Sequence, residues 1–337
     1  MERLYLDFTA PGEVSVREEP IPSLQANQVL VKTLLTAISP GTEMLIYRGQ
    51  FPTELPADAS IPELAGKFAY PMRYGYCAVG QVIQAGSLPL SAWEGRLVFS
   101  FQPHASYFVA SPAELMPLPE GMPAEDAVFL PNMETAVNLA MDGAPIIGER
   151  VLVFGQGIVG LLTTRLLAQF PLACLVTLDR YSIRRQASIE LGAHHSLDPE
   201  APATQEELGL FFNGGADLTY ELSGSPTVLD QAIAWTGFEG RVVIGSWYGQ
   251  KLAELNLGGH FHRSRIHLIS SQVSTLASRF SGRWDKQRRF EVAWEMIRSL
   301  QPSRLITQRF PFSQATQAYR LIDQHAEQTI QVVLYYN

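Results

Sequence analysis

The sequence is poor in cysteine, and this scarcity excludes two classes of protein. Only Cys77 and Cys174 occur among its 337 residues, and they lie far apart in the chain. Two distant cysteines form neither a disulfide framework nor a cysteine-rich zinc lobe, and they are typical of a reducing compartment. The first residues, MERLYLDFTAPGEV, also lack the apolar core of a secretory signal. The sequence therefore predicts a cytoplasmic protein.

Positive charge and long apolar runs are scarce as well. The 25 Lys and Arg residues are outnumbered by 33 Asp and Glu residues, which gives a formal net charge of -8. This balance disfavours nucleic-acid binding, which requires a basic face. The most apolar region, 151–178, is interrupted by Arg165 and Pro171 and is too broken to span a membrane. We therefore expect a small-molecule substrate and neither a nucleic-acid nor a membrane partner.

The pattern of apolar residues changes along the chain. Residues 1–120 contain short apolar runs between Pro and Gly turns, which indicate strands. From residue 151 to about 272, apolar strands alternate with helical segments, which is typical of a parallel sheet covered by helices on both sides. The predicted fold class is α/β, with a doubly wound parallel-sheet domain at 133–270. A β-rich catalytic domain then takes 1–132 and 271–337.

A glycine-rich loop carries the clearest chemical signal. The stretch VLVFGQGIVG has the spacing GxGxxG directly after an apolar strand and before a helix. In that context the first glycine makes a tight turn, the second admits a pyrophosphate to the backbone, and the third lets helix and strand pack closely. Free N–H groups at the helix start then attract phosphate. The loop predicts dinucleotide binding by Gly155, Gln156, Gly157, Ile158, Val159 and Gly160.

The choice between NAD and NADP depends on the end of the next strand. Asp179 lies 19 residues after Gly160, where a carboxylate accepts hydrogen bonds from ribose and repels the extra phosphate of NADP. Arg180 and Arg184 follow, and basic residues there either hold a 2′-phosphate or form a solvated helix start. We predict NAD as the cofactor, with NADP as the alternative.

Together these segments resemble a known superfamily. IIGERVLVFGQGIVG, YELSGSP, GRVVIGSW and YGYCAVGQVIQAG are similar to the medium-chain dehydrogenase/reductases, and the resemblance spans almost the whole chain. It implies a GroES-like catalytic domain, an inserted Rossmann domain and a homo-oligomer such as a dimer. SPGTEMLIYRGQFP and SSQVSTLASRFSGRWDKQRR are most similar to the branch that contains bacteriochlorophyllide a dehydrogenase, which oxidises a hydroxyethyl side chain.

The superfamily pattern implies further cofactor contacts. It puts Thr135 against the nicotinamide, Ser223 near a ribose, and Gly245 and Ser246 beside the nicotinamide amide. For each position the alternative is ordinary turn chemistry at the end of a strand. We favour the cofactor role for Gly245, and both interpretations stay open for Ser223 and Ser246.

The resemblance also raises the question of a metal. Zinc-using relatives carry a cysteine in the early loop and a histidine in a Gly-His-Glu segment, and here Ser39 and Tyr76 stand at those positions. Hydroxyl groups are poor zinc ligands, and Cys77 alone does not make a site, because catalytic zinc takes three protein ligands. We therefore predict a zinc-independent enzyme.

Without a metal, hydrogen-bond donors must stabilise the reacting oxygen. Tyr76 is either such a donor or an aromatic plug in the vacated site. Thr42 aligns with a proton-relaying hydroxyl of zinc-using relatives, or else it is the N-cap of a helix. Glu43 is either the partner of Thr42 or part of a helix start, and we favour the helix start. His104 either lines the substrate pocket or is a satisfied loop histidine.

Three functions fit these observations. The leading one is a zinc-independent NAD(P)-dependent oxidoreductase that transfers hydride between nicotinamide and an alcohol/carbonyl pair. The second is an NADPH-dependent enoyl or quinone reductase, against which Asp179 argues. The third is a dinucleotide-binding sensor or scaffold without turnover.

Overall fold

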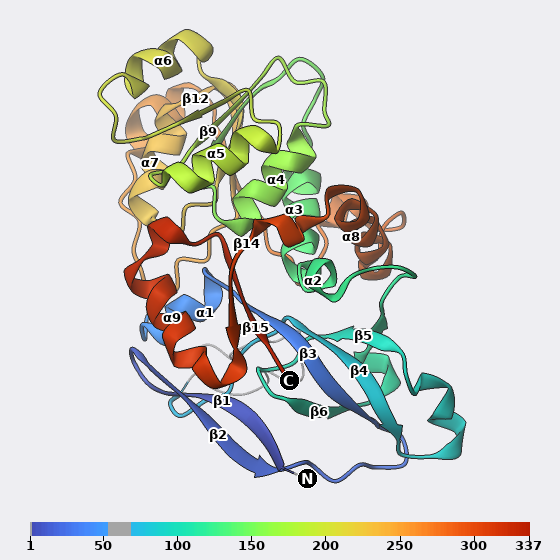
Figure 1. Cartoon of the computed structure of the whole chain (residues 1–337). Coiled ribbons are helices and arrows are strands. Elements are labelled where there is room, and N and C mark those ends of the chain that lie inside the picture. Colours follow the sequence, from blue (N-terminus) through green and yellow to red (C-terminus); the bar gives the residue numbers. More distant parts are fainter. Residues whose placement is uncertain (1, 53–68) are drawn as a thin grey trace. The chain divides into compact units, whose positions relative to one another are not determined.

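The computed structural model describes residues 2–52 and 69–337 (Figure 1). The chain divides into two compact units. The β-rich unit comprises Met1–Pro131 and Trp294–Asn337, and the parallel-sheet unit comprises Asn132–Ala293. The second unit is thus inserted into the first in the order of the sequence, and each is described by itself. None of the described helices is long and apolar enough to cross a membrane.

The parallel-sheet unit is built on a sheet of 6 strands in the order β10-β9-β8-β11-β12-β13. All pairs in it are parallel. This is the strand order of a doubly wound dinucleotide-binding domain, which places the change of direction between β8 and β11. Its strands are β8 Arg150–Phe154, β9 Cys174–Leu178, β10 His195–Leu197, β11 Ala216–Glu221, β12 Thr236–Ile244 and β13 His267–Ser270.

Both faces of this sheet are buried, which explains the unbroken apolar strands. Val151 and Val153 of β8 pack in one cluster with residues of α3 and α4, whereas Leu152 and Phe154 pack in another with residues of α6 and α7. Successive strand residues point to opposite faces, so a strand buried on both faces has no polar side. The helices are α3 Leu130–Gly143, α4 Ile158–Leu167, α5 Ser182–Glu190, α6 Thr204–Phe211, α7 Pro226–Ala234 and α8 Lys286–Leu300.

The position at which the chain returns from the parallel-sheet unit to the β-rich unit differs from the predicted one. The sequence suggested a return to the β-rich domain at 271, but residues up to Ala293 belong to the parallel-sheet unit. Arg289 of α8 gives the physical reason. It is fully buried, and its guanidinium donates to Glu134 Oε1 (2.7 Å), Asn138 Oδ1 (2.6 Å) and the Thr275 carbonyl (3.1 Å). These bonds fasten the segment before α8 to α3.

The β-rich unit contains a 7-stranded sheet, in the order β14-β15-β3-β4-β5-β7 with β6 also paired to β3, and a hairpin of β1 and β2. β15 pairs antiparallel with β3, so the C-terminal segment completes the sheet begun near the N-terminus. The elements are β1 Glu2–Ala10, β2 Glu13–Pro20, β3 Val29–Ile38, α1 Thr42–Tyr47, β4 Ala78–Ala85, β5 Leu97–Ser100, β6 Tyr107–Ala110, β7 Met116–Pro117, α2 Ala124–Ala127, β14 Ile306–Pro311, α9 Ala315–Gln324 and β15 Gln331–Tyr335.

One of the cores of this unit lies beneath α1 and α9. Met44 and Ile46 of α1 and Tyr319 of α9 are buried in a single cluster with Phe8 of β1 and Leu334 of β15. The β1–β2 hairpin, α1 and α9 therefore pack against one another although they are far apart in the sequence. The short α1, whose residues Glu43–Tyr47 are all buried, is thereby held where its first turn can contribute to a site.

Candidate functional site

The glycine loop of the parallel-sheet unit joins β8 to α4. Gly155 has φ +89°, a left-handed conformation that favours glycine, and a Cβ added there would lie 2.6 Å from the Leu222 carbonyl oxygen and Ser223 Cα. A Cβ at Gly160 would overlap the Gly155 carbonyl. These glycines are therefore required by the close packing of the loop itself.

Gly157 differs from its neighbours because a Cβ added there would meet nothing within 4 Å. It is the N-cap of α4, with no side-chain capping bond, and the first recorded helical bond runs from the Leu161 N–H to its carbonyl. The N–H groups of Ile158, Val159 and Gly160 precede that bond and are free for an anion, as at the start of any α-helix. The loop thus fits a pyrophosphate, with open space where a phosphate would approach.

The Gln156 side chain is turned inward. It is fully buried; its Oε1 accepts from Thr164 Oγ1 (3.0 Å) and its Nε2 donates to the Gly155 carbonyl (3.1 Å). It braces the loop against α4, so any cofactor contact of this residue would involve its backbone.

Asp179 lies at the end of β9 and supports the same loop. Its Oδ2 accepts from the Gln156 N–H (2.7 Å) and its Oδ1 from the Tyr181 N–H (2.9 Å). Arg184 Nη1 lies 3.9 Å from Asp179 Oδ2, with only 15% of its side chain exposed, whereas the Arg180 side chain is 63% exposed. Arg184 is therefore committed to Asp179, and Arg180 is the more available of the two cations.

A buried carboxylate that the sequence reading did not single out lies at the end of β11. Glu221 is fully buried; its Oε1 accepts from the N–H and hydroxyl of Ser223, and its Oε2 from the Tyr248 hydroxyl (2.5 Å). Ser246 Oγ accepts from the Gly224 N–H (2.9 Å), and the Gly245 N–H donates to the Glu221 carbonyl (3.1 Å). These bonds join the loops that follow β11 and β12.

This arrangement bears on the predicted cofactor contacts. The side chains of Ser223 and Ser246 are engaged by the two loops, which favours turn chemistry for them, and Ser223 lies directly against Gly155. A Cβ at Gly245 would lie 2.6 Å from Leu222 Cδ2 and 2.7 Å from Leu139 Cδ2, so tight packing requires glycine there. Thr135 is half-buried in α3. Cofactor contacts of these residues remain predictions.

The hydroxyl residues of the β-rich unit come together around the end of β3. Ser39 is buried, and its Oγ accepts from the Thr42 N–H (3.3 Å). The Tyr76 pKa is raised well above its ordinary value by burial and by the nearby Cys77 and Glu43, while hydrogen bonds with the Ser39 and Thr42 side chains oppose the rise. Tyr76 therefore keeps its proton at neutral pH and is available as a donor. The N-cap of α1 is Gly41, so the alternative that Thr42 caps this helix is wrong.

Glu43 is the centre of this cluster. It is fully buried; its carboxylate accepts from the Ser39 N–H (2.9 Å) and from the Tyr319 hydroxyl, and its Oε2 lies 2.9 Å from His104 Nε2. Glu43 lies in the first turn of α1, as predicted, and its partners show that the carboxylate is also held in a buried hydrogen-bonded cluster. No local pattern predicts Tyr319 as a partner of Glu43, because it lies 276 positions away in the chain.

His104 extends the cluster to a second strand. It is 1% exposed, and its Nδ1 lies 2.7 Å from Thr36 Oγ1, which is 3.1 Å from the Tyr336 hydroxyl. Gly75 packs against the imidazole: it has φ +129°, and a Cβ added there would lie 2.7 Å from His104 Cδ2. The ring is satisfied by these partners and the residue also lines a hollow; a role for His104 in binding substrate remains a prediction.

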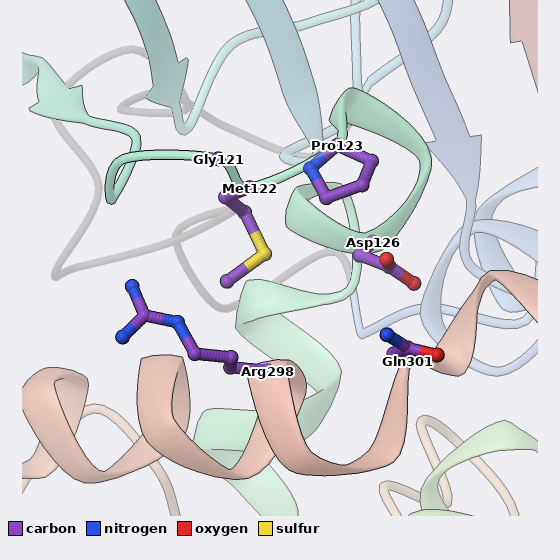
Figure 2. Close-up of a pocket in the computed structure, with 6 residues that line it drawn as sticks. All are labelled: Gly121, Met122, Pro123, Asp126, Arg298 and Gln301. Atoms are coloured by element: carbon purple, nitrogen blue, oxygen red, sulfur yellow. The ribbon is translucent and has the colours of Figure 1, made fainter.

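Two hollows of the β-rich unit were found. One, of about 210 Å³, is lined by Arg3, Tyr5, Arg73, Gln102, Pro103, His104, Ala105 and Phe108. The other, of about 120 Å³, lies between α8 and the segment before α2, where Arg298 points towards Met122 and Asp126 lies near Gln301 (Figure 2). Asp126 accepts from the Ser303 N–H (2.8 Å), so its carboxylate is part of local structure. Only the first hollow contains a residue of the Glu43 cluster.

The donors around Ser39 do not fit a zinc ion. Burial, with the charge of Glu43, raises the Cys77 pKa well above its ordinary value, and a single thiol does not make a zinc site, because catalytic zinc takes three protein ligands. Ser39 and Tyr76 offer hydroxyls, and Glu43 is occupied by its own partners. In residues 2–52 and 69–337, no group of His, Cys, Asp and Glu side chains is arranged to hold a metal.

Comparison with known proteins adds an independent line of evidence. A family model described as zinc-binding dehydrogenase matches residues 159–296, a range that excludes Ser39 and Tyr76. D-guloside 3-dehydrogenase of Escherichia coli (strain K12) is 24% identical over 344 aligned residues, covering 96% of this chain and 97% of the relative.

Solved structures share the fold. A protein described as a short chain alcohol dehydrogenase from E. coli CFT073, determined with NADH, gives a TM-score of 0.80 at 20% identity and covers 99% of both chains. The 2R,3R-butanediol dehydrogenase of Bacillus subtilis also gives 0.80, at 18% identity, with 99% of this chain and 100% of that one covered. With the glycine loop and the strand order, these findings make the chain similar in sequence to zinc-type dehydrogenases and similar in fold to solved alcohol dehydrogenases.

Proposed function

We propose that this protein is a zinc-independent, NAD-dependent dehydrogenase that interconverts a secondary alcohol and a ketone on a small polyhydroxylated molecule. The observation that carries the proposal is the cluster of Ser39, Tyr76 and buried Glu43, in which the two positions that the resemblance assigns to metal ligands, 39 and 76, hold hydroxyl side chains beside a carboxylate.

The reaction requires two transfers from the alcohol. NAD, when held by the glycine loop, would supply the hydride acceptor for the carbinol carbon. The hydroxyl proton must leave on the protein side, and the oxygen must be stabilised while it carries negative charge. Tyr76, whose raised pKa keeps the phenol protonated, donates a hydrogen bond to this oxygen. Thr42 lies within hydrogen-bonding reach of the Tyr76 hydroxyl and can pass a proton in the same site.

The preference for NAD rests on Asp179. Its carboxylate is positioned by two backbone N–H groups at the end of β9, beside the glycine loop. A charge held there repels the 2′-phosphate of NADP, and the nearest cation, Arg184, is already paired with it. The chemical class of the substrate is inferred from the names of relatives, which act on D-gulosides, L-threonine and 2R,3R-butanediol.

We also propose a homodimer. β13 is the terminal strand of the parallel sheet, and in the described part of the chain it pairs only with β12, so its outer edge is available to a second copy. Sedimentation velocity of the full chain tests this directly, and a single monomeric boundary at micromolar concentration would contradict it.

The experiment that tests the function combines cofactor binding with a substrate panel. NADH and NADPH are titrated by fluorescence. NAD- and NADP-dependent turnover is then measured with sorbitol, butane-2,3-diol, L-threonine, alkyl gulosides and a hydroxyethyl-substituted chlorin, alongside enones and quinones. Oxidation of a secondary alcohol is the expected result. Reduction of only enones or quinones would support an enoyl or quinone reductase, and NADH binding without any turnover would support a sensor.

Elemental analysis tests zinc independence in the same preparation. We expect no stoichiometric zinc, and full activity after treatment with a strong chelator. One tightly bound zinc per chain, with activity lost on its removal, would contradict the proposal, since catalytic zinc is held by three protein ligands and binds tightly.

A further inference from the structure

We propose that the hollow of about 210 Å³ in the β-rich unit binds a small carboxylate with a compact apolar body, of the size of benzoate. The inference goes beyond the proposed function, because none of Ser39, Thr42 and Tyr76 lines this hollow. Its evidence is a pair of cationic side chains, an unpartnered buried amide and an apolar wall that meet in one cavity.

The charge that lines the hollow is positive. Arg3 and Arg73 are among its lining residues, whereas Glu19, to which both of them are paired, is not. Asp7 lies 3.7 Å from Arg73 Nε and is matched in turn by Arg17, whose Nε is 3.4 Å away. One positive charge therefore remains when all of these residues are counted, and a monoanion would neutralise it. A cavity lined by charge of one sign attracts ligands of the opposite sign.

Glu19 holds the two guanidinium groups in place. Its Oε1 accepts from Arg3 Nε (2.8 Å) and Arg73 Nη1 (2.9 Å), and its Oε2 from Arg73 Nη2 (2.8 Å). The hydrogen bonds from Arg73 and Arg3 lower the Glu19 pKa against the effect of burial, so the carboxylate stays ionised at neutral pH. A guanidinium carries five N–H donors. Within the described residues, hydrogen bonds to Glu19 and the Tyr107 carbonyl take three from Arg3, and bonds to Glu19 take two from Arg73. Both keep donors for a second carboxylate.

Gln102 supplies a polar group that the protein itself does not use. The residue lines the hollow and is 8% exposed. Its backbone N–H donates to the Ser100 carbonyl (3.0 Å), but its side-chain amide has no hydrogen-bond partner in residues 2–52 and 69–337. A buried amide without a partner costs free energy. A ligand oxygen in the hollow would satisfy it, because the amide nitrogen donates two hydrogen bonds.

The remaining lining residues favour an organic anion over an inorganic one. Phe108 and Ala105 are buried and Pro103 is half-buried, and all three line the hollow. The Tyr5 ring is covered by Arg73, whose Cζ lies 3.7 Å from the ring centroid. A cavity of about 150 Å³ holds benzene, so this hollow has room for one ring and a carboxylate. Burial of the ring against Phe108 would add hydrophobic stabilisation that phosphate or sulfate cannot gain.

The hollow adjoins the hydroxyl cluster but is distinct from it. His104 lines the hollow, and both nitrogens of its ring already have partners, Glu43 and Thr36. Its ring nitrogens are therefore not the groups that would bind the carboxylate. Arg73 lies three residues before Tyr76 in the chain. An occupant would thus contact the segment that carries Tyr76 without using Tyr76 itself.

The β1–β2 hairpin supplies a matched control for the charge. Arg73 and Arg17 are 39% and 50% exposed, and both lie near Asp7, but only Arg73 lines the hollow. Arg73→Gln and Arg17→Gln therefore remove the same charge from the same surroundings. Two further variants leave every charge in place: Gln102→Met removes the amide, and Ala105→Leu fills the cavity.

The experiment is isothermal titration calorimetry of the full chain, in the presence of NADH, with benzoate and its neutral analogue benzamide. Benzoate is expected to bind at one site per chain, about 10-fold more tightly than benzamide. Arg73→Gln and Gln102→Met should each weaken benzoate binding by about 10-fold, the effect of losing one hydrogen bond to a charged group. Ala105→Leu should abolish it, and Arg17→Gln should match the wild type.

Four results would overturn the site. They are no saturable binding of benzoate to the wild type, equal affinity for benzoate and benzamide, equal losses in Arg73→Gln and Arg17→Gln, and wild-type affinity in Ala105→Leu. If Arg73→Gln does not fold, the comparison of the two ligands and Ala105→Leu still decide. The titration needs no turnover, so its outcome is independent of whether the protein oxidises an alcohol.

Discussion

The two units of this protein present polar groups in opposite ways. In the parallel-sheet unit the proposed phosphate site is made of backbone N–H groups at the start of α4, and the buried carboxylate Glu221 bonds mainly to residues close to it in sequence. In the β-rich unit the site is made of side chains, and the buried carboxylate Glu43 bonds to residues up to 276 positions away. Binding at the phosphate site should therefore be sensitive to substitutions that add atoms. The function of the side-chain site of the β-rich unit should be sensitive to substitutions that remove atoms.

The largest effect is expected from adding a methyl group at Gly157. A Cβ there meets nothing within 4 Å, so Gly157→Ala should fold normally, but it fills the space that a pyrophosphate needs. Loss of two hydrogen bonds to a charged phosphate, at about 1.5–3 kcal/mol each, predicts NADH binding weaker by roughly 10²-fold or more.

Fluorescence titration of NADH measures this effect, with urea unfolding as the check on stability. Gly209→Ala is the matched control, since a Cβ at this glycine of α6 also meets nothing within 4 Å. Equal NADH affinity of Gly157→Ala and Gly209→Ala would show that the loop does not hold the cofactor.

The next largest effect is expected from removing one oxygen at Tyr76. Tyr76→Phe keeps the ring and its packing but loses the donor, which typically costs about 10²–10³-fold in turnover. Thr42→Val should act in the same direction and more weakly. NADH affinity should not change, so steady-state turnover is measured beside the NADH dissociation constant.

The contrary outcome for Tyr76 is also specific. If the residue only fills space, Tyr76→Phe will have wild-type turnover, while Tyr76→Ala will lose stability because it opens a cavity in the apolar cluster that contacts Tyr76. That result would remove Tyr76 from the chemistry and leave Thr42 and the Glu43 cluster.

A smaller effect is expected at Asp179, where charge rather than size is changed. Asp179→Asn keeps an oxygen for the backbone N–H bonds of Gln156 and Tyr181 but removes the negative charge. Repulsion of about 1 kcal/mol between unit charges near 4 Å in water predicts a shift in the NADPH-to-NADH affinity ratio of roughly 5- to 10-fold.

The relative affinities of the wild-type protein for NADPH and NADH also test the role of Asp179. Tighter binding of NADPH than of NADH by the unmodified protein would reject the role given to Asp179. Arg180→Ala would then be the informative variant, because the Arg180 side chain is 63% exposed and more available than that of Arg184.

The smallest effect compares the single cysteine of each unit. Burial raises the pKa of both thiols, for Cys77 together with the charge of Glu43, and for Cys174 against the opposing charge of Arg150. A raised pKa leaves little thiolate at pH 8, and the thiolate is the nucleophile. We expect iodoacetamide to modify Cys174 slowly, faster as the pH rises, and to leave the fully enclosed Cys77 intact until unfolding.

Peptide mapping of the alkylated protein by mass spectrometry checks this order. Native Cys77 reacting before Cys174 would show that the Ser39–Tyr76 region is more open to solvent than the structure indicates. It would also weaken the argument that Tyr76 keeps its proton because it is desolvated.

The prediction from sequence was good where the signal was local. One contiguous stretch contains the strand of residues 151–154, the glycine loop and the helix after it. The positions of its glycines and apolar runs indicate the backbone dihedrals and the packing that it requires. The boundary at 271 was not local, because it depends on which unit the buried Arg289 contacts. The same limitation left the distant partners of Glu43 unpredicted, although its place at the start of a helix was predicted.

The sequence by itself determined the α/β fold class and the glycine loop, because both depend on residue type and short spacing. The hydroxyl residues Ser39 and Tyr76 at positions that the resemblance assigns to metal ligands remain a prediction. Only the tertiary structure decided which buried side chains lie around the hydroxyl groups of Ser39 and Tyr76. Thr36 meets Tyr336 across 300 positions, and Glu43 meets Tyr319 across 276. Contacts of that kind arise when β15 pairs with β3 and α9 packs near α1. Spacing along the chain carries no information about them, since sheet pairing and core packing bring these side chains together.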